Sequence, residues 1–74
     1  MQKRLRDLRE DHDLNQTQVA SILNMSQSGY SKYETGENDI PTAVLIKLAD
    51  FYDTSVDYIL GCTNEIKRYP NATI

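Results

Sequence analysis

Polar side chains recur along residues 26–36, SQSGYSKYETG. Their spacing of i, i+1, i+4, i+5 and i+8 places one set on the same side of a helix: Gln27, Ser28, Ser31, Lys32 and Thr35. Amide, hydroxyl and ammonium groups can donate and accept the hydrogen bonds that base edges offer in the major groove of DNA. The alternative is a solvated polar face on an acidic protein, since the net charge is −3.

No set of residues in the sequence predicts catalysis or a metal site. The carboxylates are scattered over the ends of expected helices, whereas catalysis needs groups that converge in a cleft. Cys62 is the single cysteine, so the chain can form neither an internal disulfide nor a Cys/His zinc site. The single histidine, His12, lies among acidic residues, where we expect a surface position. We therefore expect no enzymatic activity, no cofactor and no small-molecule ligand within this chain.

The size and composition favour one small helical domain. A chain of 74 residues buries a modest core, and 3 glycines with 2 prolines favour helices over a turn-rich β-fold. The longest apolar run, Ala43–Ile46, is far too short to cross a membrane. The N-terminal MQKRLRDLRE lacks the apolar segment of a signal peptide. Together with the unpaired cysteine, these features predict a cytoplasmic protein with no membrane contact.

Apolar spacing and helix caps predict five short helices. The first covers about residues 2–12, the second 15–23 and the third 26–35. The fourth begins around Pro41–Thr42, because proline suits a first turn, and the fifth follows a cap at Ser55. The sequence thus predicts an all-α fold, a compact five-helix bundle.

Residues 1–61 make up this predicted domain, and residues 62–74 form a C-terminal tail. The tail, CTNEIKRYPNATI, has weak periodicity and a late proline, so we expect it to be mobile or associated with a dimer. The apolar faces expected to build the core are Leu5 and Leu8, then Val19, Ala20, Ile22 and Leu23, then Leu45, Leu48, Ala49 and Tyr52.

Only Asn24 and Met25 separate the second and third helices. Such a tight junction between two amphipathic helices is the geometry of a helix-turn-helix. Ala20 is small where the two helices approach, and Asn24 stands where a left-handed backbone is needed. The second helix opens with Asn15 and Gln18, which resemble a capping box.

With these residues in place, the chain resembles the Cro/repressor, or XRE-type, family of helix-turn-helix proteins. The resemblance covers about residues 3–61 and rests on Leu5–Arg9, Leu14–Ala20, Met25–Ser28, Tyr30–Glu34, Gly36, Leu45, Leu48–Ala49 and Ser55–Tyr58. It implies a lambda-repressor-like bundle whose third helix enters the DNA major groove.

The resemblance also implies which residues contact DNA and which hold the helices together. DNA contacts are expected at the start of the second helix and along the third, from Gln16, Ser26, Gln27, Ser28, Ser31, Lys32 and Thr35. Arg9 and Glu34 are expected to form a structural pair that ties the third helix to the first. The implied function is sequence-specific regulation of transcription, as a bacterial or phage repressor. The implied partners are double-stranded DNA with a palindromic operator and a second copy of the chain.

One departure from the family pattern supports a rival interpretation. The loop after the third helix, often basic in phage repressors, here reads Glu37-Asn38-Asp39. These acids either weaken non-specific DNA binding or point away from DNA. The rival is a protein-interaction module of the same fold, for example an antitoxin, with weak or no DNA binding. The outer positions Ile46 and Tyr58 fit either a core rim or a dimer surface.

Overall fold

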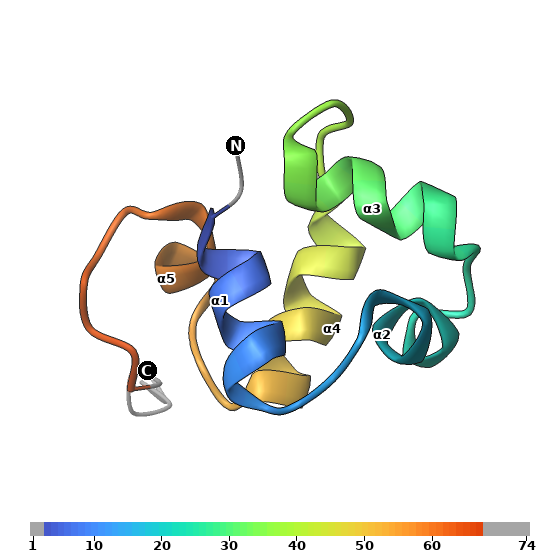
Figure 1. The fold of residues 1–74 in the computed structure, drawn as a ribbon. Helices are drawn as coiled ribbons and strands as arrows, with labels where there is room; N and C mark the ends of the chain where they lie inside the picture. The colour runs from blue at the N-terminus through green and yellow to red at the C-terminus, as the bar shows by residue number, and fades with distance from the viewer. Residues whose placement is uncertain (1–2, 68–74) are drawn as a thin grey trace.

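The computed structural model describes residues 3–67, and this part of the chain forms five helices without strands (Figure 1). The helices are α1 (Lys3–Asp11), α2 (Gln16–Ile22), α3 (Gln27–Thr35), α4 (Thr42–Tyr52) and α5 (Val56–Leu60). The predicted all-α five-helix bundle is therefore confirmed. Residue 2 of the first expected helix and residues 68–74 of the expected tail lie outside the described residues.

Polar caps explain where the helices begin. Asn15 forms the predicted capping box, since its side chain accepts from the backbone of Gln18 and the Gln18 side chain accepts from Asn15 N–H. The hydroxyl of Ser26 accepts a hydrogen bond in the first turn of α3, and Ser55 does the same in α5. Pro41 stands just before α4 as its N-cap residue, rather than in the first turn as predicted.

Residues with a left-handed backbone conformation lie at the ends of helices or in the junctions between them. Gly36 follows α3 with φ of 82°, and Asp53 follows α4 with φ of 53°. Asn24 has φ of 59°, so it takes the left-handed conformation predicted for the α2–α3 junction. Asp13 does the same between α1 and α2.

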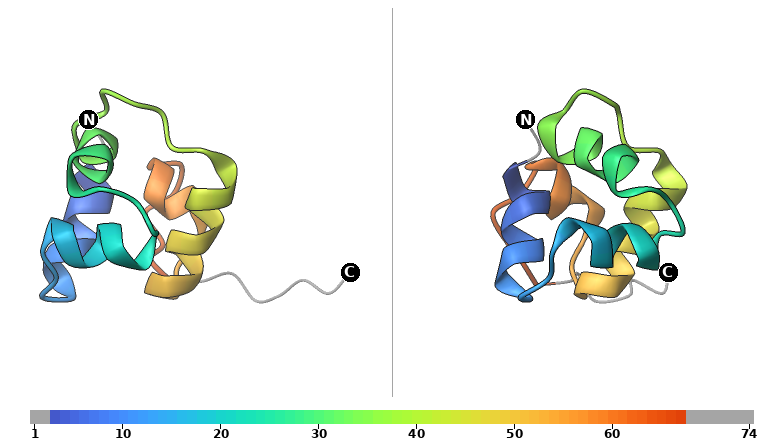
Figure 2. Two further views of the ribbon diagram at one scale, coloured as in Figure 1. Left: turned by 90° about the vertical axis from the view of Figure 1, so that its right-hand side faces the viewer. Right: turned by 45° about the vertical axis from the view of Figure 1, so that its right-hand side comes forward.

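The core lies among all five helices. Its buried apolar residues are Leu5, Leu8, Val19, Ala20, Tyr30, Leu45, Leu48, Ala49, Tyr52 and Ile59. The helices α2 and α3 pack together, and α5 packs on α1 and α4. Figure 2 shows the loop that crosses from the end of α3 to the start of α4. In this arrangement α3 lies along one side of the molecule.

One expected core residue lies at the surface. Ile22 is 37% exposed, although the sequence placed it on the buried face of its helix. At about 100° per residue, Val19, Leu23 and Ala20 lie within an arc of about 100°, whereas Ile22 falls about 60° outside that arc, beyond Val19. Leu23, which was also expected in the core, is half-buried against it.

The segment after α5 returns along the bundle and is held by Arg4 of α1. The guanidinium group of Arg4 lies 4.3 Å from the centre of the Tyr58 ring and donates to the Tyr58 and Thr63 carbonyl oxygens. Farther along, the buried Thr54 hydroxyl donates to the carbonyl of Ile66 at 2.5 Å. These contacts hold the segment after α5 against α1 and against the turn between α4 and α5.

Candidate nucleic-acid interface

The turn between α2 and α3 is fixed by its own backbone. Met25 N–H donates to the carbonyl of Ala20 at 2.9 Å, and Asn24 supplies the left-handed residue between them. Gly29 in α3 leaves room for this turn, because a Cβ there would lie 3.1 Å from the Ser26 hydroxyl and 3.2 Å from the Met25 methyl. The close neighbours of Gly29 are thus residues of the turn. This geometry sets the angle at which α3 leaves α2.

A buried ion pair ties α3 to α1. Arg9 Nε lies 2.6 Å from Glu34 Oε2, and Arg9 Nη2 donates to Glu34 Oε1 at 3.2 Å. The side chains are only 12% and 5% exposed, respectively. Arg9 also donates to the carbonyl of Leu14, which follows α1. Such bidentate geometry with further hydrogen bonds is what a buried charge pair requires.

The environment of Glu34 keeps it ionised. Burial alone would raise the pKa of the Glu34 carboxyl, but hydrogen bonds from Arg9 and Gln16 outweigh burial and hold that pKa below its ordinary value. The Glu34 carboxylate in turn raises the pKa of the Arg9 guanidinium. Burial raises the pKa of Tyr30, and it raises the pKa of Tyr52 to about 12. The charged pair of Arg9 and Glu34 therefore lies beside the neutral phenol groups of Tyr30 and Tyr52.

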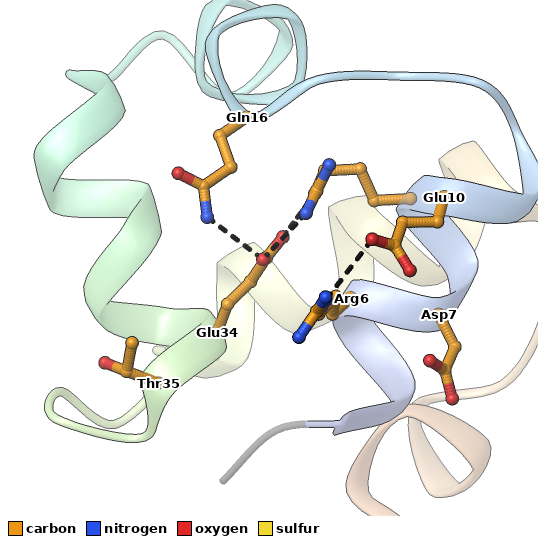
Figure 3. Close-up of a pocket in the computed structure, with 7 residues that line it drawn as sticks. Arg6, Asp7, Glu10, Gln16, Glu34 and Thr35 are labelled. Carbon is orange, nitrogen blue, oxygen red and sulfur yellow. Dashed lines mark hydrogen bonds and ion pairs between the residues drawn. The ribbon is translucent and has the colours of Figure 1, made fainter.

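A chain of hydrogen bonds runs from this pair to the first residue of α3. Gln16 Nε2 donates to Glu34 Oε1 at 3.1 Å, and Gln27 Nε2 donates to Gln16 Oε1 at 2.6 Å. Figure 3 shows Gln16 reaching Glu34. Because a primary amide has two N–H groups and one carbonyl, Gln27 retains one donor and one acceptor for another molecule. These hydrogen bonds fix the orientation of the Gln27 amide, and therefore which edge of it presents the remaining N–H and which presents the carbonyl oxygen.

The remaining residues of the predicted interface fall into two groups. Ser28 and Lys32 are exposed and Ser31 is half-buried, all on α3. Ser26 and Thr35 are exposed but also serve the ends of α3: the Ser26 hydroxyl accepts from Gly29 N–H, and the Thr35 hydroxyl donates to the Lys32 carbonyl. The structure thus brings the predicted residues onto α3 and the start of α2.

A hollow of about 760 Å³ adjoins these residues, and the sequence interpretation missed it (Figure 3). Its lining comes from α1 and from the ends of α2 and α3: Arg6, Asp7, Arg9, Glu10, Gln16, Glu34 and Thr35. Arg6 is the exposed cation among them, in an ion pair with Glu10. The sequence feature that could have revealed Arg6 is its position three residues before Arg9, which places both side chains on the same side of α1.

Residues 3–67 contain no group of three or more histidine, cysteine or acidic side chains placed to hold a metal ion. None of the described helices is long and apolar enough to cross a membrane. Cys62 is an exposed free thiol after α5.

Residues 5–59 match the family model described as helix-turn-helix, which covers more than half of the chain. The protein therefore belongs to the helix-turn-helix family, and the predicted XRE-type resemblance and lambda-repressor-like fold are confirmed.

Curated relatives carry regulatory names. The chain is 43% identical over 63 residues to YobD of Bacillus subtilis, named an HTH-type transcriptional regulator; the match covers 85% of this chain and 56% of YobD. It is 37% identical over 59 residues to the HTH-type transcriptional regulator ImmR of Bacillus subtilis, covering 80% of this chain and 46% of ImmR. It is 30% identical over 59 residues to the antitoxin PezA of Streptococcus pneumoniae, covering 80% of this chain and 37% of PezA.

This chain thus spans about half the length of YobD and ImmR. No solved structure matches it.

Proposed function

We propose that this protein is a sequence-specific DNA-binding transcriptional regulator, a repressor that inserts α3 into the major groove. The observation that carries the proposal is the division of α3 into two faces. One face, with Tyr30 and Glu34, is buried and fixed to α1. The other presents polar residues of the proposed interface: Gln27, Ser28, Ser31, Lys32 and Thr35. Ser26, the N-cap of α3, and Gln16, at the start of α2, complete the proposed interface. A rigid helix with a polar outer face is what reading base edges requires.

Gln27 is the main reading residue of this proposal. Its remaining donor and acceptor match N7 and the N6 amino group of adenine, which glutamine binds in a bidentate manner. Lys32 can donate to guanine O6 and N7 or to a phosphate, and Ser28 makes a shorter contact. The start of α2, at Gln16, lies beside Gln27 and would approach the backbone of one strand.

The proposed DNA site is palindromic and is bound by a homodimer in the cytoplasm. A module of this size buries too little surface on DNA for tight binding alone. Two copies related by a two-fold axis would place their α3 helices in half-sites about 34–36 Å apart.

The test is selection of binding sites from random duplex DNA, followed by affinity measurements over a salt series. We expect site-dependent affinity and a negative slope of log K against log salt. Gln27→Ala should lose about 1–3 kcal/mol of binding free energy at the selected site. Lys32→Ala should weaken binding, whereas Lys47→Ala, which removes an exposed lysine of α4, should not. A folded chain that binds no duplex at low salt would refute the proposal.

The second candidate is a protein-interaction module, and two observations favour it. The antitoxin PezA is among the relatives, and the loop after α3 is acidic. On that interpretation, Gln27→Ala would leave DNA affinity unchanged because α3 would not be the reading helix. The same set of variants therefore separates the two candidates.

A further inference from the structure

Two exposed cations, Lys32 within the proposed interface and Arg6 beside it, are each paired with an exposed acid. Arg6 Nε lies 3.3 Å from Glu10 Oε2, and Lys32 Nζ lies 3.8 Å from Glu37 Oε2. The side chains of these pairs are between 51% and 65% exposed. Pairs this exposed contribute little to stability. Their position therefore calls for an explanation other than holding the fold.

The position of the Lys32–Glu37 pair follows from the end of α3. Gly36 turns the chain in a left-handed conformation, and the backbone N–H of Asn38 donates to the Lys32 carbonyl at 3.1 Å. This turn carries Glu37 back beside Lys32, the one basic residue of α3. The loop thus brings a negative charge to the proposed reading helix.

The Arg6–Glu10 pair lies at the other edge of the same region. Arg6 and Glu10 line the hollow that Gln16 and Thr35 also line (Figure 3). Since both of those residues belong to the proposed interface, a DNA backbone that reaches them also passes beside Arg6. Within this hollow Arg9 is committed to the buried Glu34, which leaves Arg6 as the exposed cation.

We propose that Arg6 and Lys32 are phosphate contacts, and that Glu10 and Glu37 are the acids that phosphates must displace from them. This inference rests on the proposed function. When a phosphate takes the cation, DNA releases a counterion, but the displaced acid stays beside the phosphates, where its negative charge retains a cation from solution. The two effects nearly cancel. The acids thereby keep sequence-independent binding weak and nearly insensitive to salt at these two positions, so that base contacts decide which DNA is occupied.

The experiment measures affinity for a selected and a scrambled duplex across a salt series, with Glu10→Gln, Glu37→Gln and the double variant. Each neutralised acid should steepen the slope of log K against log salt by about 0.9 and raise affinity for both duplexes ~5-fold at physiological salt. The double variant should show about twice the change in slope. The melting temperature should stay close to that of the unmodified chain, because the pairs are exposed.

Matched controls separate ion-pair exchange from general repulsion. Asp39→Asn removes the same charge from the same loop, two residues after Glu37, and should raise affinity much less. The gain from Glu37→Gln should vanish in a Lys32→Met background, and the gain from Glu10→Gln should vanish with Arg6→Met. A gain that persists in those backgrounds, or that Asp39→Asn reproduces in full, would overturn the inference.

The failure of this inference is distinguishable from failure of the proposed function. If the unmodified chain is folded and binds no duplex, both are wrong. If it binds a selected site, but neutralising Glu10 and Glu37 changes neither affinity nor salt slope, only the ion-pair exchange is wrong.

Discussion

The two faces of α3 carry similar ion pairs that have different roles. On the inner face, Glu34 pairs with Arg9 where both side chains are largely buried, with two hydrogen bonds to one guanidinium. On the outer face, Lys32 pairs with Glu37 at 3.8 Å, and both side chains are more than half exposed. Burial, rather than the type of charge, decides that the first pair holds the helix and the second remains available to another molecule.

The largest effect should come from breaking the inner pair. Glu34→Ala leaves Arg9 buried with its charge uncompensated, so the free energy of unfolding should fall by about 3–5 kcal/mol. Urea denaturation monitored by circular dichroism measures the loss. Glu37→Ala is the matched control, since it removes an acid from the outer pair. A loss below about 1 kcal/mol for Glu34→Ala would mean that burial does not distinguish the two faces.

Acid should reproduce part of this loss without a mutation. The pKa of Glu34 is below its ordinary value in the folded protein, so its contribution to stability is present at pH values above the ordinary carboxyl pKa. That contribution is lost as the pH falls through the lowered pKa. The loss should be smaller than for Glu34→Ala, because a protonated carboxyl still accepts hydrogen bonds. Thermal melts from neutral to acid pH, with Glu34→Gln as the variant lacking this titration, provide the measurement.

A smaller loss of stability is expected from a change at the N-terminal end of α3. Ser26→Ala removes the N-cap bond to Gly29 N–H and should lower the free energy of unfolding by about 1 kcal/mol. Ser28→Ala, two residues later and exposed, should change it by less than about 0.5 kcal/mol. Equal losses in chemical denaturation would show that Ser26 does not act as a cap.

The smallest effect on stability belongs to the outer pair itself. Lys32→Ala should alter the free energy of unfolding by about 0–1 kcal/mol while weakening DNA binding. Differential scanning calorimetry beside a binding assay would show the two quantities changing independently. A large drop in melting temperature would place Lys32 with the inner face.

The sequence predicted the helices well because their ends depend on local chemistry. Asn15, Asn24 and Ser55 each carry a side chain that suits a cap or a left-handed residue, and the structure confirms those positions. Ile22 was assigned wrongly because it lies at the edge of the apolar face of α2, and how far burial extends around a helix depends on which neighbours pack against it.

Apart from the Arg9–Glu34 pair, which the family resemblance implied, the long-range hydrogen bonds could not be predicted from the sequence. The contact between Gln16 and Gln27 joins two helix starts, and the hollow beside Arg6 depends on how α1 meets α3. Both follow from packing angles that residue spacing does not specify. The DNA-contact residues remain a prediction, since they derive from the family resemblance and the exposed face of α3.

Arg4 makes the two ends of this small domain mechanically dependent on each other. It binds carbonyl groups 54 and 59 residues farther along the chain, so fraying of α1 also removes the contacts that hold the start of the segment after α5. Amide hydrogen exchange should therefore report the opening of both ends as one cooperative event rather than as two independent ones.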